Sequence, residues 1–158
     1  MGEAHMKMTG EERIPASREA VWAALNDPEV LRKCIPGCQE LEKRSDTELA
    51  ATVGIKMGPV KATFDGEVEL SDLEPPVSYR IAGEGKGGVA GHAKGGANVR
   101  LSEVPADGAP GTETLLAYDV DASVGGKIAQ LGGRLIDSTA KKLAGKFFAN
   151  LREHFENG

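Results

Sequence analysis

Apolar and polar residues alternate with a period of two along much of this chain. The alternation is cleanest in residues 49–57 and 60–70, where every second side chain is apolar or small. Weaker versions of the same pattern cover 6–14, 39–44, 77–81, 99–101 and 116–124. This period is typical of half-buried β-strands, and short turns such as Gly58-Pro59 and Pro75-Pro76 separate several of them. The pattern therefore predicts an antiparallel sheet.

Three other segments follow the helical period. Ser17 is a natural N-cap for a short helix at Arg18–Leu25, and a second short helix is expected at Glu29–Cys34. A long helix is expected from Gly126 to Phe155. Its apolar residues recur at steps of three, four or eight: Ile128, Leu131, Leu135, Leu143, Phe147, Leu151 and Phe155. Glycines at 125–126 and 132–133 weaken the start of this helix.

The order of these elements predicts an α+β fold. A curved antiparallel sheet of about six or seven strands would wrap around the long C-terminal helix, with two short helices after the first strand. This is a helix-grip arrangement. Residues 6–157 are expected to form one domain, and residues 1–5 precede a second possible start at Met6, so we set them apart as a cloning remnant.

The helix-grip geometry predicts a space between the helix and the sheet. A strongly curved sheet is too wide for side chains to fill, and Ala51, Ala62, Gly66 and Ala122 on its inner face would widen the gap. We expect an apolar cavity of ligand size, with the Tyr79 and Tyr118 hydroxyls as its polar contacts. The expected lining is Val53, Ile55, Met57, Phe64, Val68, Tyr79, Tyr118, Val120, Leu131, Leu135, Leu143 and Phe147. The competing interpretation is a core that these side chains fill completely.

A glycine-rich stretch runs from Gly83 to Gly96. Gly83, Gly85 and Gly88 match the spacing of a dinucleotide-binding turn, but no helical pattern follows, so we do not assign a nucleotide site. The glycines instead indicate a sharply bent, bulged or mobile hairpin. One functional interpretation is a flap or partner-docking loop whose charged contacts are Lys86, His92 and Lys94.

Composition narrows the function classes. A net charge of −5 and an aromatic content of 4% argue against a nucleic-acid surface. The two cysteines, Cys34 and Cys38, have no second pair with which to hold zinc, and we expect both to be reduced. No apolar run is long enough to cross a bilayer and no signal peptide is recognisable, so a cytoplasmic protein is expected. Neither a metal nor a resident cofactor is expected.

Candidate catalytic groups are few. The three histidines are dispersed along the chain, and Asp119 and Asp121 alternate with apolar residues, which predicts a solvated strand face. Glu12 shares a strand face with Met8 and Ile14 and, if it were buried, would need a partner or a raised pKa. A solvent-accessible position at the strand end is the simpler expectation for Glu12. The sequence therefore favours a protein that is not an enzyme.

Several short motifs together resemble the carbon monoxide dehydrogenase G-subunit family, within the START-like and polyketide cyclase-like superfamily. They are MKMTGEERI (6–14), EAVWAALNDPEVL (19–31), CIPGC (34–38), GPVKA (58–62), GEGKGG (83–88), AKGGA (93–97), YDVDA (118–122) and VGGKIAQLG (124–132). The resemblance covers residues 6 to about 155. It implies a helix-grip fold (START-like or Bet v 1-like) with an apolar cavity, and an accessory role beside an aerobic molybdenum hydroxylase that oxidises carbon monoxide. Some relatives continue into a membrane-directed tail, which we expect to be missing or trimmed here.

Three functions follow from the resemblance and the expected cavity. The first is a carrier that binds a lipophilic molecule, preferably a respiratory quinone, and couples carbon monoxide dehydrogenase to the membrane through transient contact with its inner face. The second is a factor that recruits or assembles the dehydrogenase, with an incidental cavity. The third is a small START-like cyclase or hydrolase, against which the shortage of acid–base groups argues.

Overall fold

The computed structural model describes residues 3–108 and 110–157. Seven strands, three α-helices and two 3-10 helices make up this part of the chain. In order they are β1 (Glu3–Ile14), α1 (Arg18–Leu25), α2 (Pro28–Cys34), β2 (Cys38–Lys43), β3 (Glu48–Met57), β4 (Val60–Glu74), β5 (Ser78–Lys86), η1 (Gly88–Ala90), β6 (His92–Pro105), β7 (Thr112–Gly125), η2 (Lys127–Leu131) and α3 (Gly133–Glu156). The predicted α+β helix-grip fold is confirmed.

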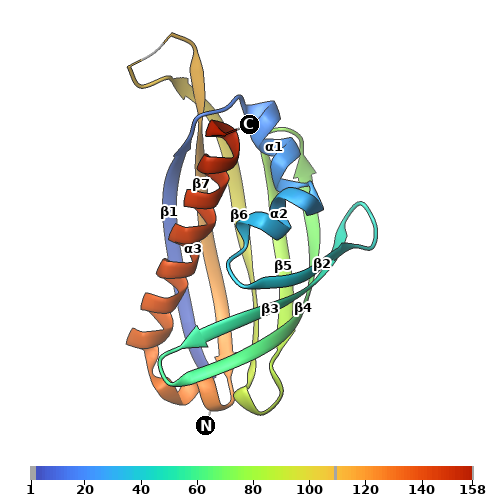
Figure 1. Ribbon diagram of the computed structural model, residues 1–158, viewed down its shortest axis with the longest axis vertical. Helices are drawn as coiled ribbons and strands as arrows, with labels where there is room; N and C mark the ends of the chain where they lie inside the picture. Colours follow the sequence, from blue (N-terminus) through green and yellow to red (C-terminus); the bar gives the residue numbers. More distant parts are fainter. Residues whose placement is uncertain (1–2, 109, 158) are drawn as a thin grey trace.

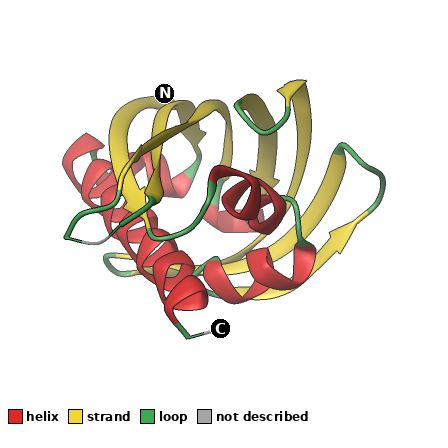
Figure 2. Ribbon diagram, turned by 90° about the horizontal axis from the view of Figure 1, so that it is seen from above, coloured by secondary structure: helices red, strands yellow, loops and turns green. Residues whose placement is uncertain are grey.

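All the strands belong to one antiparallel sheet. Its order is β1-β7-β6-β5-β4-β3-β2, so each strand from β2 to β7 lies beside its neighbour in sequence and β1 closes against β7. The sheet curls around α3, which runs along its open side, and α1 and α2 cover the remainder of the concave face (Figures 1 and 2). Glu3, Ala4 and His5, which the sequence analysis set apart, pair with β7 as the first residues of β1. Residues 1–2 lie outside the described part.

Local chemistry explains the two short helices. The Ser17 hydroxyl accepts a hydrogen bond from the Ala20 amide at 3.1 Å, and the Asp27 carboxylate accepts one from the Glu29 amide at 2.9 Å. Each interaction caps a helix N-terminus that would otherwise leave amides without partners. The fully buried Thr114 hydroxyl on β7 donates to the Ala16 carbonyl at 2.8 Å. This hydrogen bond attaches the segment that connects β1 with α1 to β7.

The long C-terminal helix begins later than the sequence predicted. Gly126 and Gly132 have φ angles of 82° and 96°, and the residues between them form the short 3-10 helix η2. Glycine adopts such angles at low cost, whereas other residues do not, so the chain turns twice before α3 starts at Gly133. The continuous helix expected from Gly126 was therefore wrong at its N-terminal end.

The glycine-rich stretch forms the predicted hairpin, and only its tip is a loop. Gly83 and Gly85 lie in β5, Gly95 and Gly96 lie in β6, and the turn between the strands is confined to residues 87–91. A Cβ atom at Gly83 would meet the Glu67 carbonyl oxygen at 2.5 Å, and one at Gly95 would clash with the Asp121 carbonyl oxygen. The glycines thus permit close approach of neighbouring strands in a strongly bent sheet.

Candidate functional site

Two regions of the concave face differ in how they are filled. The closed end is the part covered by α1, α2 and the C-terminal half of α3. Its side chains pack into one large cluster that includes Ile14, Val21, Leu101, Leu116 and Leu151, each at most 2% exposed. The hollow end holds a second, smaller cluster that includes Met6, Phe64, Val124, Ile128 and, from the N-terminal half of α3, Ile136. Two adjacent rows across the sheet consist mostly of small residues: Ala51, Gly66, Gly85 and Ala93 in one, and Val68, Gly83, Gly95 and Ala122 in the next.

A groove of about 550 Å³ opens between α3 and β3 at the hollow end. Its apolar contacts come from Ile55 on β3 and from Leu135 and Leu143 on α3. The remaining lining residues are Pro36, Gly37, Gly54, Lys56, Gly58, Ser138, Thr139, Lys142 and Lys146. An apolar groove with a few polar groups at its edge is the usual form of a site for a hydrophobic small molecule.

The structure distributes the twelve predicted lining residues over three places. Ile55, Leu135 and Leu143 lie in the groove. Met57, Phe64, Val120 and Leu131 belong to the cluster at the hollow end, and half-buried Val53 pairs with Phe64 across β3 and β4. Val68, Tyr79, Tyr118 and Phe147 belong to or border the cluster at the closed end. Their role as ligand contacts stays a prediction.

Three helix residues that face the sheet were not predicted. Ile136 and Phe148 are 3% and 7% exposed, and Thr139 is 9% exposed and also lines the groove. The predicted apolar stripe assumed a helix start at Gly126, whereas α3 begins at Gly133. The Phe147-Phe148 pair could have indicated the wider stripe. Two adjacent aromatic residues cannot both lie on one narrow stripe of a helix, and only Phe147 was included in it.

Aromatic rings and an ion pair hold the closed end together. Tyr79 meets Trp22 edge-on at 5.2 Å between ring centroids, and Tyr118 stacks on Phe148 at 5.4 Å. Burial raises the pKa of Tyr79 far above its usual range. The pKa of Tyr118 is also raised, mainly by burial and secondly by the negative charge of Glu12.

Glu12, which the sequence left open, has a partner. Its carboxylate accepts a hydrogen bond from the Arg152 guanidinium at 2.8 Å, and the two side chains are 26% and 35% exposed. Two residues earlier on α3, the Asn150 side-chain amide donates to the Cys34 carbonyl at 3.0 Å. These two contacts attach the C-terminal half of α3 to β1 and α2.

The cysteines offer no reactive centre. Both are free, and burial raises the pKa of each thiol, more than the nearby Lys33 and Arg32 lower it. A thiol with a raised pKa is a poor nucleophile at neutral pH. Among residues 3–108 and 110–157, no three His, Cys, Asp or Glu side chains are grouped so that they could hold a metal ion.

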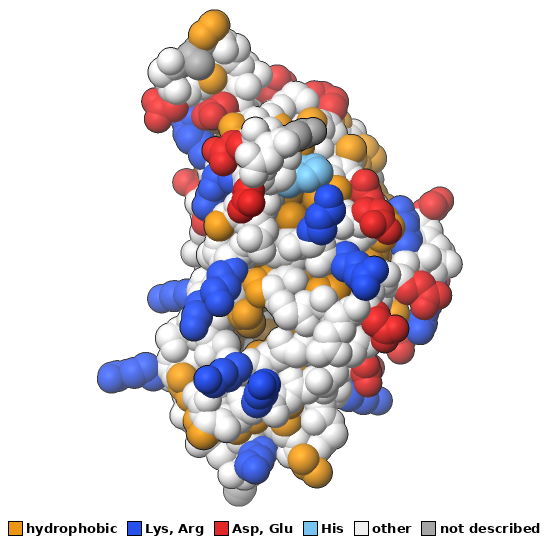
Figure 3. All heavy atoms as spheres, in the orientation of Figure 1, with side chains coloured by type: hydrophobic (Ala, Val, Ile, Leu, Met, Phe, Trp, Pro, Cys, Tyr) orange, Lys and Arg blue, Asp and Glu red, His pale blue; other side chains and the backbone are white. Residues whose placement is uncertain are grey.

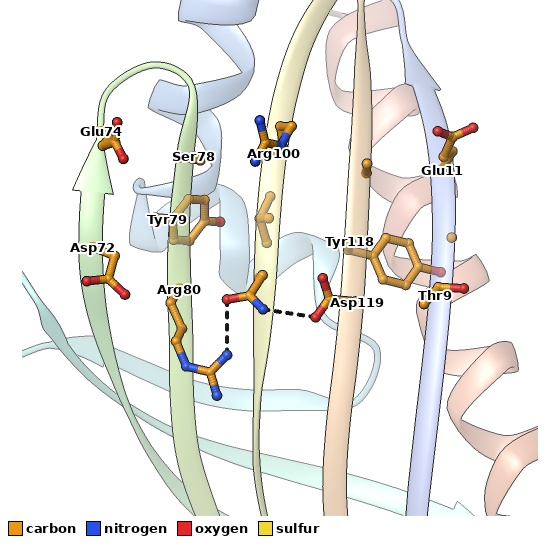
Figure 4. A pocket seen from close by; sticks show the side chains of 14 residues that line it. Thr9, Glu11, Asp72, Glu74, Ser78, Tyr79, Arg80, Arg100, Tyr118 and Asp119 are labelled. Carbon is orange, nitrogen blue, oxygen red and sulfur yellow. Dashed lines mark hydrogen bonds between the residues drawn. The ribbon is translucent and has the colours of Figure 1, made fainter.

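A second hollow, of about 580 Å³, lies on the opposite, convex face of the sheet (Figure 4). Three polar side chains cross its floor: Arg80 donates to Asn98 at 3.0 Å, and Asn98 donates to Asp119 at 2.9 Å. Asp119 and Asp121 are exposed on this face, as the alternation predicted. Because the floor is polar and internally hydrogen-bonded, it is poorly suited to a lipophilic molecule.

The charged residues predicted for a flap lie on strands and not in a loop. Lys86 ends β5, and His92 and Lys94 lie at the start of β6, all three exposed. Lys86 and His92 are paired directly across the two strands.

In the described part of the chain, no helix combines the length and the apolar character that crossing a membrane requires.

Comparisons with known proteins agree with this architecture. Residues 10–156 match the family model that describes the CoxG subunit of carbon monoxide dehydrogenase. A search of curated proteins found no match. Among solved structures, a conserved protein from Geobacillus kaustophilus is 30% identical, with a TM-score of 0.84 over 99% of this chain and 96% of that one.

More distant structures share the fold alone. A START superfamily protein from Mycobacterium smegmatis is 17% identical, with a TM-score of 0.68 over 98% of this chain and 99% of that one. The Zhui aromatase/cyclase from Streptomyces is 14% identical, with a TM-score of 0.56 over 98% and 94%. The family match spans nearly all of β1 to α3 and confirms the resemblance found in the motifs. The chain belongs to the CoxG family of carbon monoxide dehydrogenase subunits.

Proposed function

We propose that this protein is a non-enzymatic accessory protein of an aerobic molybdenum carbon monoxide dehydrogenase. In this proposal it binds a lipophilic molecule between α3 and the sheet and couples the enzyme to the membrane. A respiratory quinone is the preferred ligand, because the electrons that such an enzyme releases must reach the membrane pool. The family match over residues 10–156 supports the partner.

The observation on which ligand binding rests is the groove between α3 and β3. Ile55, Leu135 and Leu143 make it apolar, and Gly37, Gly54 and Gly58 in its lining contribute no side chains that would fill it. The volume of about 550 Å³ is within the range of small-molecule sites.

A non-enzymatic role is supported by the state of the ionisable groups. Glu12 faces the helix but is engaged by Arg152 at 2.8 Å. The raised pKa values of Tyr79, Tyr118, Cys34 and Cys38 keep these groups protonated at neutral pH. None of these groups combines a free base with a nucleophile.

The test is an organic-solvent extract of the purified protein, analysed for isoprenoid quinones and other lipids, before and after incubation with a quinone. We expect one lipophilic molecule per chain in the wild type. Leu143→Trp, which fills the groove, is expected to lose it. Leu73→Trp is the matched control, because Leu73 is 38% exposed and lies outside the groove lining. An extract free of lipid under both conditions contradicts the carrier role.

One feature favours recruitment of the dehydrogenase as a second role. Val89, at the tip of the β5–β6 turn, is 93% exposed although it is apolar. An exposed valine between two charged strand ends suits a small protein contact. Capture of purified dehydrogenase by wild-type protein, weakened at least tenfold by Val89→Ser but not by Leu73→Ser, is the expected result. Equal capture by both variants contradicts this role.

A further inference from the structure

Basic side chains collect around the mouth of the groove. Lys56 and Lys61 lie on the β3–β4 hairpin, Arg134, Lys141 and Lys142 lie on the N-terminal half of α3, and Lys146 lies just past the middle of that helix. We call these six exposed residues the basic rim. The rim joins two segments far apart in the sequence, because the hairpin lies against the start of α3: a Cβ atom at Gly58 would meet Leu135 at 2.7 Å. Figure 3 shows basic side chains over the lower half of the molecule and acidic ones towards the top and right.

The placement of these charges does not serve the stability of the fold. Lys56 and Lys61 are directly opposite each other across the hairpin, an arrangement that like charges disfavour. Arg134 lies in the first turn of α3, where a cation opposes the helix dipole. From Gly133 to Arg152 the helix contains one carboxylate, Asp137.

In the described part of the chain, no residue of the rim takes part in an ion pair. Every ion pair found within residues 3–108 and 110–157 joins side chains outside the rim. The protein as a whole has a net charge of −5, so the rim reverses the overall sign locally. A charge pattern that costs stability and lacks internal partners is suited to an external anionic partner.

The apolar groove between the cations indicates which anionic partner fits this surface. The groove inside the rim is apolar at Ile55, Leu135 and Leu143, and Lys56, Lys142 and Lys146 border it directly. Nucleic acid does not suit this surface, because aromatic stacking residues make up only 4% of the chain. Phosphate head groups above acyl chains match both the basic rim and the apolar groove.

We propose that the basic rim docks the protein onto a bilayer that contains anionic phospholipids, with the mouth of the groove facing the head groups. The exchange of a lipophilic ligand through this mouth rests on the function proposed above. Docking itself does not rest on that function, since docking depends on the rim and can be measured on vesicles that hold no quinone. In this orientation a ligand passes between bilayer and groove without crossing water.

Co-sedimentation with vesicles tests the proposal. We expect the full chain to bind vesicles of phosphatidylcholine with about 30% phosphatidylglycerol and not vesicles of phosphatidylcholine alone. Binding should be lost in about 1 M salt, where the Debye length is about 3 Å. Each basic residue removed should weaken binding about fivefold, so Lys56→Gln, Lys142→Gln and Lys146→Gln together should weaken it about 100-fold.

A second triple variant controls for net charge. Lys7, Lys33 and Lys94 are exposed and lie outside the rim, and their substitution by Gln changes the net charge by the same amount. This control should bind within about threefold of the wild type, and thermal unfolding should show that both triple variants are folded. Equal losses in the two triple variants, equal binding to both vesicle types, or no binding to either type overturns the proposal. So does a rim variant that binds vesicles normally but no longer captures the dehydrogenase, because the rim would then be a protein interface.

Discussion

The two halves of α3 lie on the same sheet but have different structural roles. The C-terminal half is attached by Phe148 and Leu151 in the core and by Asn150 and Arg152 through polar contacts. The N-terminal half packs through Ile136 into the smaller cluster and forms one wall of a groove. In this fold, stability and ligand space are therefore divided along one helix, and substitutions at matched positions should separate them.

Leucine truncation should show the largest difference. Leu151→Ala, at a site 1% exposed, should lower the free energy of unfolding by about 3 kcal/mol, because it removes buried methyl groups and leaves a cavity. Leu143→Ala, at a half-buried position in the groove, should cost about 1 kcal/mol. Urea denaturation measures both. Equal losses would mean that the groove end is as well packed as the closed end.

The glycines of the bent strands give the next effect. Gly83→Ala places a Cβ atom 2.5 Å from both the Glu67 carbonyl oxygen and a Val68 methyl carbon. The resulting overpacking should cost about 2 kcal/mol. Gly133→Ala is the control, because nothing lies within 4 Å of that Cβ position and alanine favours a helix. If the two variants are equally stable, the glycines are not required by the curvature.

The ion pair between Glu12 and Arg152 should make a smaller contribution. A double-mutant cycle with Glu12→Gln and Arg152→Gln should give a coupling energy of about 1 kcal/mol, since the contact is 2.8 Å and both groups are partly shielded from water. The same cycle on Lys7 and Asp121, 4.0 Å apart and 82% and 66% exposed, should give a coupling near zero. A larger coupling for the exposed pair would contradict the attachment of α3 through Arg152.

The tyrosines give the smallest effect under ordinary conditions. Burial raises the folded-state pKa of Tyr79 above its unfolded value of about 10. The stability that this shift contributes is present below pH ~10 and is lost as the pH rises above it, since the unfolded chain then releases the proton more readily. Tyr79→Phe should reduce this loss of stability at high pH more than Tyr118→Phe does, because Tyr79 is the more deeply buried tyrosine. Unfolding measured from pH 8 to about 11 checks this order.

The sequence predicted most of the fold because its signals are local. Alternation at 49–57 and 60–70, the Ser17 cap, and the apolar stripe of α3 each depend on neighbouring residues. The error, a helix start at Gly126, lies where the positive φ angles of Gly126 and Gly132 decide. The hairpin expected over Gly83–Gly96 is present, but the need of Gly83 and Gly95 for close strand contact is visible only once β4 and β7 lie beside them.

The site was harder to predict for the same reason. Residue alternation gave the inner face correctly, but it could not show where along that face the helix leaves space. Tyr79 and Tyr118 share this face with Ile55, yet aromatic partners Trp22 and Phe148 cover them. The basic rim is also invisible in sequence, because its residues gather only when the β3–β4 hairpin meets α3.

Native mass spectrometry most directly tests whether the groove at the hollow end holds a lipophilic ligand. After incubation with a respiratory quinone or with a lipid extract, the wild type and Leu73→Trp should each carry one added molecule per chain. Leu143→Trp should carry none while remaining folded. Equal occupancy in Leu143→Trp, or no adduct on the wild type, would contradict ligand binding in this groove.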